Sequence, residues 1–323
     1  MSTDWQPTAS KAMLAARAAV NAQIRSFFAA RGVLEVDTPL LCHASGTDPN
    51  LHPVTAGYQS HPQAHPQTLY LQTSPEFAMK RLLAAGSGAI FQLCKAFRNG
   101  ESGSRHNPEF TMLEWYRPGF TLTQLMDEVE ALVKSVLPPG SAVQRLSYRQ
   151  LFQQALAIDP HTLPLVQLQA LTLQRVPVSP TVLGSRAACL DLLYGHVIEP
   201  TLQAPVFIYH YPAAQAALAR VVNDELGQPV ALRFELVMQG MELANGYDEL
   251  VDAAEQARRF AADQQARQQQ QLPAIAIDQR LLAALQAGMP ACAGVALGVD
   301  RLLMLQTGAI HIDDVLAFPL ERA

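Results

Sequence analysis

The segment that most restricts the fold runs from Phe97 to Tyr116, where two apolar stretches flank a polar loop of nine residues. The loop contains two glycines, an arginine and a histidine, and the aromatic-rich residues 109–117 after it predict a strand. Because side chains alternate along a strand, one face is expected to carry Phe110, Met112, Glu114 and Tyr116. With Arg98 arriving from the preceding strand, this face is suited to hold a nucleotide beside an amine. The simpler alternative is a β-hairpin with a solvated, charged loop.

The composition is that of a large folded protein. The 323 residues are 49% hydrophobic, which is ample for one large core. The net charge is −5 and no run of Lys or Arg stands out, which argues weakly against a nucleic-acid partner. The four cysteines form no CxxC pair, so we expect buried thiols in a reducing compartment rather than a zinc or redox site. No secretory signal or membrane-spanning run is visible, and we expect a soluble, cytoplasmic protein.

The rest of the chain predicts helices interleaved with strands. A helix is expected from Ser10 to about Arg31, and its apolar stripe should consist of Val20, Ile24, Phe27 and Phe28. Residues 42–67 have the composition of a loop, and residues 141–205 are predicted to be mostly helical. Because no βαβ regularity is present, the fold class is α+β, with a mixed, mostly antiparallel sheet flanked by helices. We expect a single domain, residues 1–323, with a helical insertion at about 141–205.

Three segments, in order, resemble the motifs of class II aminoacyl-tRNA synthetases. Residues 31–39 with the preceding helix are similar to motif 1, residues 97–116 to motif 2, and residues 294–301 to motif 3. Within that class, residues 105–111 and 242–246 resemble the lysyl enzymes most closely. The resemblance implies the class II catalytic fold. It also implies a homodimer, because motif 1 forms the dimer interface in that family.

Motif 1 begins almost at residue 11, which leaves no room for the anticodon-binding domain of lysyl-tRNA synthetases. The chain therefore also resembles the family of free-standing elongation factor P–(R)-β-lysine ligases. This resemblance implies activation of (R)-β-lysine with ATP and Mg²⁺, transfer to a lysine side chain of elongation factor P, and no tRNA or membrane partner. Two alternatives stay open: a ligase for another diamino acid or acceptor, and a non-catalytic synthetase paralogue.

The resemblance assigns the catalytic role to Arg98, whose guanidinium would bridge the substrate carboxylate and the α-phosphate. Arg105 and His106 would meet the outer phosphates, and the adenine would lie between Phe110 and Arg301. The complete set of expected ATP-binding residues is Arg98, Asn99, Gly100, Arg105, His106, Asn107, Phe110, Glu242, Leu243, Gly298 and Arg301. The competing interpretations are a surface ion pair for Arg98, solvated loop charges, and a core position for Phe110.

Glu235 and Glu242 are the predicted metal ligands. If Met238 and Gln239 form a two-residue loop, the two glutamates lie directly opposite each other on a hairpin, where like charges destabilise. A Mg²⁺ ion between them would remove that cost, and the resemblance implies such a site. The alternative is two solvated glutamates on a shifted register.

A doubly cationic amino acid needs acidic side chains in its pocket. By resemblance, Glu76 and Glu114 lie near the amine beside the reacting carboxylate, while Glu249 and Tyr116 hold the distal ammonium and Asn245 the carboxylate. The expected substrate-binding residues are Ser74, Pro75, Glu76, Glu114, Tyr116, Asn245, Glu249 and Ala296. Ser74 is also predicted to cap a helix that starts at Pro75. Glu76 has a structural alternative as an acid complementing the helix dipole, and Glu249 as a surface acid.

The chain departs from the family pattern at two positions. Motif 2 normally has a glutamate where this chain has Gly100, and Glu101 follows one residue later. The lysyl form of motif 3 has a glycine where this chain has Ala296. Because a pocket discriminates a methyl-sized change, we hypothesise that Ala296 disfavours α-lysine and helps to select the β-amino isomer.

Overall fold

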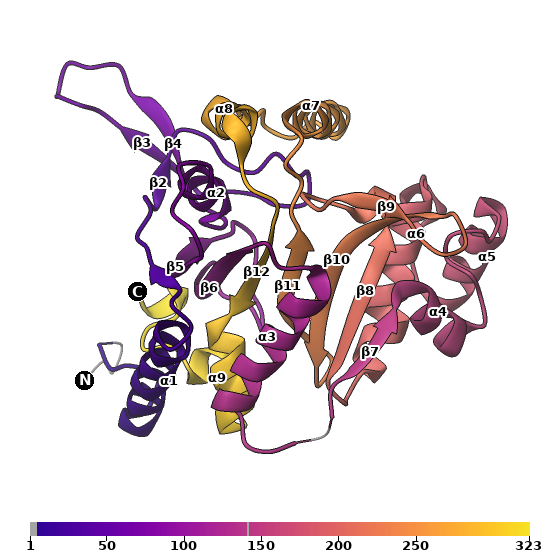
Figure 1. Ribbon diagram of the computed structural model, residues 1–323, viewed down its shortest axis with the longest axis horizontal. Helices are drawn as coiled ribbons and strands as arrows, with labels where there is room; N and C mark the ends of the chain where they lie inside the picture. Colours follow the sequence, from indigo (N-terminus) through magenta and orange to yellow (C-terminus); the bar gives the residue numbers. More distant parts are fainter. Residues whose placement is uncertain (1–4, 141) are drawn as a thin grey trace. The chain divides into compact units, whose positions relative to one another are not determined.

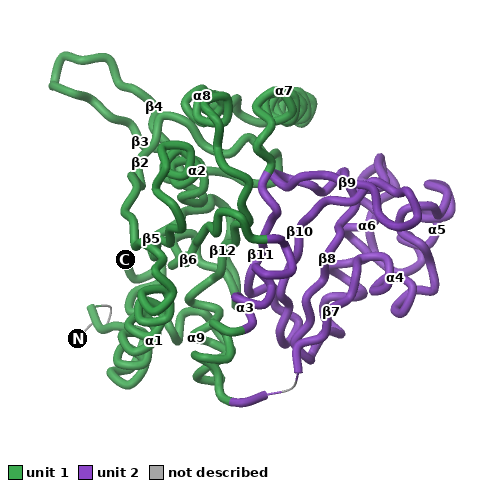
Figure 2. The backbone as a smooth tube through the Cα atoms, in the orientation of Figure 1, with its two compact units in different colours: residues 1–120, 131–138, 250–323 green, residues 121–130, 139–249 purple. Residues whose placement is uncertain are grey.

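The computed structural model describes residues 5–140 and 142–323, which form two compact units (Figures 1 and 2). Unit 1 contains the described parts of residues 1–120, 131–138 and 250–323, and unit 2 those of residues 121–130 and 139–249. Residues 1–4 and 141, which belong to the predicted single domain, lie outside the described residues. The assignment of residues 141–205 as an insertion stays a prediction.

The main sheet of unit 1 contains the predicted hairpin. Its strands follow the order β1 (Leu34–Glu35), β5 (Ile90–Phe97), β6 (Glu109–Pro118) and β12 (Cys292–Gly298). β1 is parallel to β5, and the other pairs are antiparallel. The predicted strand pair 89–98 and 109–117 is therefore confirmed, and the alternation along β6 places Glu114 and Tyr116 on one face.

Helix α1 (Lys11–Ala29) covers the opposite face of this sheet. Ser10 begins the helix by accepting the N–H of Met13 with its side chain. The buried side chains of α1 are those of the predicted stripe, Val20, Ile24, Phe27 and Phe28. Phe28 stacks on Phe91, with ring centroids 4.5 Å apart, and meets Trp115 edge-on. Phe91 and Trp115 thus form the apolar part of the face against α1, while Glu114 and Tyr116 lie on the other face.

A second, smaller sheet in unit 1 corrects the predicted loop at residues 42–67. Its strands are β2 (Leu41–Cys42), β4 (Gln67–Leu71) and β3 (Thr55–Tyr58), in that order. β3 is mostly exposed, so its sequence lacks the apolar alternation that marks a strand. Pairing with β4 satisfies its backbone, and the two strands form a hairpin that projects from the unit (Figure 1). The other helices of unit 1 are α2 (Glu76–Ala84), α7 (Ala253–Gln269), α8 (Gln279–Gly288) and α9 (Val299–Thr307).

Unit 2 is built on a sheet with helices packed against it. Its strands follow the order β11 (Met241–Asp248), β10 (Pro229–Met238), β8 (Val206–Pro212) and β7 (Gln144–Ser147), with β9 (Val221–Asn223) paired to β10. β7 runs parallel to β8, and the other pairs are antiparallel. The helices are α4 (Tyr148–Leu156), α5 (Leu165–Arg175) and α6 (Arg186–Leu193), while α3 (Leu122–Val136) contributes residues to both units. Residues 142–205 are thus largely helical, with one strand that the sequence analysis did not predict.

The hairpin of β10 and β11 turns one residue later than predicted. Gln239 and Gly240 form the two-residue loop, with φ of +54° and +63°, and Met238 pairs with Met241. A turn of this kind needs positive φ at both central residues, and Gly240 adopts it at little cost. A register shift follows, so Val237 pairs with Glu242 and Glu235 with Asn245. The predicted loop at Met238–Gln239 and the direct pairing of Glu235 with Glu242 are therefore wrong.

The sheets are mixed and mostly antiparallel and are flanked by helices, as the sequence predicted. All four cysteines are free: Cys189 and Cys292 are buried as expected, while Cys42 and Cys94 are partly buried. Within residues 5–140 and 142–323, no helix combines the length and the apolar character required to cross a membrane.

Candidate active site

The centre of the candidate site in unit 1 is Glu114, a carboxylate that is only 2% exposed. Ser74 Oγ donates to one of its oxygens and the Tyr116 hydroxyl to the other, both at 2.6 Å. Burial, followed by the nearby charge of Glu76, raises the pKa of Glu114 from 4.5 to about 7. The carboxyl group therefore titrates near neutrality, and a substrate ammonium would favour its ionised form.

Glu76 lies beside Glu114 at the start of α2. The helix begins at Glu76 rather than at Pro75 as predicted, and Ser74 Oγ accepts the N–H of Glu76 at 3.0 Å. Lys80, one turn further on, places its Nζ 2.6 Å from Glu76 Oε1 and is only 1% exposed. The sequence analysis missed Lys80, although Glu–Lys at i,i+4 on a helix is a recognisable pairing signal.

Strand β12 supplies the neighbouring surface. Ala296 pairs with Glu114 across the antiparallel β6–β12 ladder, so the two side chains share a face. The strand ends at Gly298, where an added Cβ would lie 3.5 Å from the Arg301 side chain. That distance is an ordinary van der Waals contact, so the Arg301 side chain lies directly next to the strand end.

Arg98 stands at the end of β5. Its backbone N–H donates to Pro108 O at 2.9 Å, and its guanidinium carbon lies 5.2 Å from the centroid of the Phe110 ring. Glu101 forms an ion pair with Arg98, with N···O of 3.5 Å. Glu101 thus contacts Arg98, although it lies one residue after the position of the usual motif 2 glutamate.

The polar loop folds back onto α9. Arg301 Nη2 lies 2.6 Å from His106 Nε2, and Arg301 Nε donates to Arg105 O at 3.3 Å. Asn107 donates to Glu109 O and accepts the N–H of Leu320. The loop starts at Asn99, whose N–H donates to His52 O at 2.7 Å. The structure therefore brings His106 and the backbone of Arg105, two predicted phosphate contacts of motif 2, to Arg301 of motif 3.

Asp300 fixes this arrangement, and the sequence analysis did not identify it. Its carboxylate accepts from Arg17 Nη2 at 2.5 Å and from the Thr111 N–H at 2.6 Å. Asp300 is buried, and these bonds join the first turn of α9 to α1 and β6. The arginine next to it in the sequence, Arg301, is positioned by this anchor.

Unit 2 carries the predicted metal ligands. Glu235 is buried and forms an ion pair with Arg233, and the Tyr194 hydroxyl donates to it at 3.3 Å. Burial and then the charge of Glu242 raise the pKa of Glu235 to about 7. The two acids therefore interact electrostatically, although they are not directly opposed in the ladder.

The carboxylates of Glu235 and Glu242 are the candidate donors for Mg²⁺. Among the described residues, no group of three or more His, Cys, Asp or Glu forms a metal cage. Mg²⁺ in nucleotide sites uses one or two protein carboxylates together with phosphates and water. The mutual repulsion of Glu235 and Glu242 is the kind of unfavourable contact that such a cation relieves, so the donor set fits.

The remaining predicted residues of unit 2 lie on β11 and directly after it. Asn245 pairs with Glu235 and accepts from Arg233 Nε at 3.2 Å. Leu243 is buried, and Glu249 is only 1% exposed. The alternative reading of Glu249 as a surface acid is therefore wrong.

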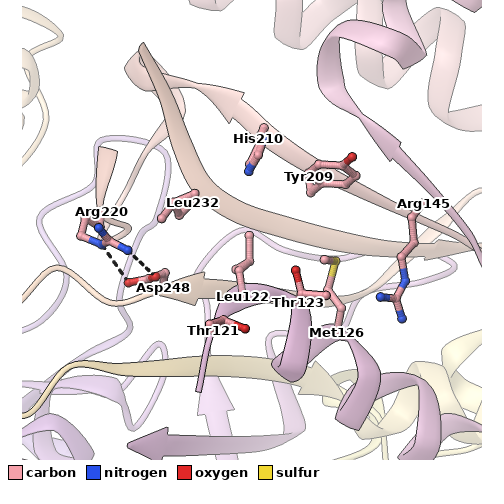
Figure 3. Close-up of a pocket in the computed structure, with 10 residues that line it drawn as sticks. All are labelled: Thr121, Leu122, Thr123, Met126, Arg145, Tyr209, His210, Arg220, Leu232 and Asp248. Carbon is pink, nitrogen blue, oxygen red and sulfur yellow. Dashed lines mark hydrogen bonds and ion pairs between the residues drawn. The ribbon is translucent and has the colours of Figure 1, made fainter. Parts of the chain in front are cut away.

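A separate cavity of about 420 Å³ lies within unit 2 (Figure 3). Arg220 and Asp248 form a two-bond ion pair at one end, and Arg145 lies at the other. The described lining residues include none of the predicted site residues; they are Thr121, Leu122, Thr123, Met126, Arg145, Tyr209, His210, Arg220, Leu232 and Asp248. This cavity is therefore distinct from the candidate active site.

The fold is that of a class II synthetase. Residues 2–322 match the family described as tRNA synthetases class II (D, K and N), and the chain belongs to that family. It is similar to proteins named elongation factor P–(R)-beta-lysine ligase. The one from Pseudoalteromonas translucida is 50% identical, over 99% of this chain and 98% of its own length. Those from Pectobacterium carotovorum and Salmonella paratyphi B are 48% and 49% identical, over 99% of this chain and 99% and 98% of their own lengths. The chain is accordingly an ATP-dependent ligase of the class II synthetase type.

Proposed function

We propose that this enzyme activates (R)-β-lysine as an adenylate and transfers the β-lysyl group to a lysine side chain of elongation factor P. The name shared by relatives about half identical over nearly the whole chain supports this substrate and acceptor. The observation that carries the proposal is the buried Glu114, with both oxygens held by hydroxyl groups and a second acid beside it. Such a pocket suits an ammonium group.

In the first step, the substrate carboxylate attacks the α-phosphorus of ATP and pyrophosphate leaves. Negative charge builds up on the phosphoryl oxygens, and a positioned guanidinium stabilises it. Arg98 is the group for this task, because it can bind a carboxylate and a phosphate with parallel hydrogen bonds. Its ion pair with Glu101 is replaced by contacts with the substrates when they bind.

In the second step, the neutral ε-amine of the acceptor lysine attacks the acyl carbon of the adenylate. The new amide bond forms, AMP leaves, and the amine releases a proton. Glu76 and Glu114 hold the β-lysyl amine during this transfer. That contact keeps the acyl carbon in place for attack.

Glu235 and Glu242 would hold Mg²⁺, with Arg105, His106 and Arg301 contacting the nucleotide. The ion would supply positive charge next to the triphosphate. Asn245 and Glu249 complete the proposed substrate contacts.

We further propose that the enzyme is a cytoplasmic homodimer that does not charge tRNA. The segment that resembles motif 1 and the two residues after it expose three leucines, Leu34, Leu40 and Leu41. Apolar side chains grouped on a surface favour an interface. Sedimentation of the purified protein gives the oligomeric state.

Pyrophosphate exchange tests the first step, and intact mass spectrometry tests the second. Protein with ATP, Mg²⁺ and (R)-β-lysine should exchange labelled pyrophosphate. Added elongation factor P should gain the mass of one β-lysyl residue on one lysine. Exchange without the mass gain would support the activation step but reject elongation factor P as the acceptor. If no diamino acid supports exchange, the proposal that this site is catalytic is rejected.

A further inference from the structure

Lys80 carries a buried ammonium that is bonded to Glu76, one of the two acids proposed to hold the substrate amine. It is 1% exposed, and its Nζ lies 2.6 Å from Glu76 Oε1. Burying an ammonium is costly unless it is paired. A solvated lysine one turn after a glutamate would already stabilise the helix, although only slightly. Helix stability therefore gives little reason to bury this residue so deeply.

Hydrogen bonds connect Lys80 to Glu114 through Glu76 and Ser74. Glu76 accepts from Lys80 and donates its N–H to Ser74 Oγ, which in turn donates to Glu114. Glu76 and Glu114 repel each other, as the raised pKa of Glu114 shows, and Lys80 acts in the opposite direction. With both acids ionised, the group Glu76, Lys80 and Glu114 carries a net charge of −1, which one substrate ammonium neutralises.

We infer that Lys80 is a positioning residue for substrate recognition: its buried ammonium holds Glu76 in place and sets the charge of the acid pair to match a single ammonium. This inference deepens the proposed function and rests on it. Without the ammonium of Lys80, the buried carboxylate of Glu114 and the partly buried carboxylate of Glu76 would face one substrate cation. Glu114 would then remain protonated to a higher pH, and a protonated acid does not attract the substrate ammonium.

The charged and titratable groups that act most strongly on Glu114 lie on the elements next to it. On α2 they are Glu76 and Lys80, on β6 Tyr116, and on β5 Cys94, whose thiol has its pKa raised by burial and by Glu114. On β12, the residue paired with Glu114 is the uncharged Ala296. Helix α8, which packs against α2, carries Arg280 with Asp278 as its N-cap. Lys80 is therefore the cation on helix α2 whose charge lowers the pKa of Glu114.

Two substitutions separate charge from packing. Lys80→Met keeps most of the volume and removes both the charge and the hydrogen bond. Lys80→Gln removes the charge and keeps an N–H donor toward Glu76. A purely structural role would be restored by glutamine, whereas a charge-setting role would not.

The measurement is kcat/KM for (R)-β-lysine in pyrophosphate exchange between pH 6 and 8.5. For the wild type, kcat/KM should rise as Glu114 ionises, with a midpoint near its pKa of about 7. Both variants should move that midpoint upward by about one pH unit, since removing an opposite charge a few ångströms away shifts a pKa by about 1–3. At pH 7 the ionised fraction of Glu114 would fall from about one half to about one tenth, so kcat/KM should fall about fivefold, mainly through KM. A folded Lys80→Gln protein with the wild-type midpoint overturns the inference.

A wild-type crystal with bound (R)-β-lysine tests the inference without any variant. The Lys80 ammonium should remain bonded to Glu76 while the substrate amine contacts Glu114. A bound amine distant from both acids, or a Lys80 turned away from Glu76, overturns it. The two proposals fail differently: wild-type protein that exchanges no pyrophosphate with (R)-β-lysine rejects the proposed function, whereas normal wild-type exchange with an unshifted Lys80→Gln profile rejects only the role of Lys80.

Discussion

Ala296 lies directly opposite Glu114 in the antiparallel ladder of β12 and β6. The Cβ atoms of such a pair are about 4.5–5.5 Å apart, so the methyl group borders the carboxylate proposed to receive the substrate amine. The structure thus puts the one residue of motif 3 that departs from the lysyl pattern next to the acid of motif 2. A change of one methyl group at this place alters the space beside the amine without altering any charge.

Ala296→Gly should therefore relax the choice between lysine isomers. We expect activation of α-lysine relative to (R)-β-lysine to increase by up to about tenfold, the lower end of the discrimination that a methyl-sized change provides. The ratio of the two kcat/KM values in pyrophosphate exchange measures it. Ala293→Gly is the matched control, because Ala293 lies three residues earlier on the same strand and faces the other way. An unchanged ratio in Ala296→Gly would reject the hypothesis.

Glu114→Gln should change how stability depends on pH. The pKa of Glu114 rises from 4.5 in the unfolded chain to about 7 in the folded protein. The folded state therefore holds this proton more tightly, and stability is lost as pH rises from about 4.5 through 7. Since glutamine does not titrate, the variant should gain about 2–3 kcal/mol relative to wild type between pH 5 and pH 8. Urea unfolding at both pH values measures this gain. Parallel pH profiles for the two proteins would contradict the shifted pKa.

The sequence predicted the structure best where an element has one periodic pattern of side chains and packs against one neighbouring surface. The stripe on α1 predicted its buried side chains correctly, because this helix packs one face against the sheet. The alternation on β6 predicted which side chains share a face, but not that residues 111–116 are buried on both faces. The β10–β11 turn was predicted one residue too early, because a shift of one residue separates the two possible registers. The positive φ that Gln239 adopts in the turn is not visible in a hydrophobic pattern. The sequence analysis did not identify Lys80 and Asp300, because a charged residue on a helix is normally solvated. Only tertiary packing shows that these two are buried.

Asp300→Asn should weaken both the fold and nucleotide binding. Asp300 holds Arg17 and the Thr111 N–H in a buried setting, so the loss of its charge should cost about 2–4 kcal/mol of unfolding free energy. Because Arg301 is the next residue, the affinity for ATP should fall as well. Asp313→Asn is the control: its ion pair with His311 is exposed and should contribute less than about 1 kcal/mol. Equal urea midpoints for Asp300→Asn and Asp313→Asn would show that Asp300 is not an anchor.

Glu242→Gln should raise the Mg²⁺ concentration needed for activity. Glu242 and Glu235 repel each other in the structure, and removing one carboxylate leaves the proposed cation with a single protein ligand of full charge. At saturating ATP and (R)-β-lysine, the Mg²⁺ concentration for half-maximal exchange should increase several-fold, and high Mg²⁺ should recover part of the rate. Glu225→Gln, at an exposed position of the same unit, should keep the wild-type Mg²⁺ dependence. If Glu242→Gln lowers the rate equally at every Mg²⁺ concentration, Glu242 acts on the substrates by another route, and the acid pair is not the metal site.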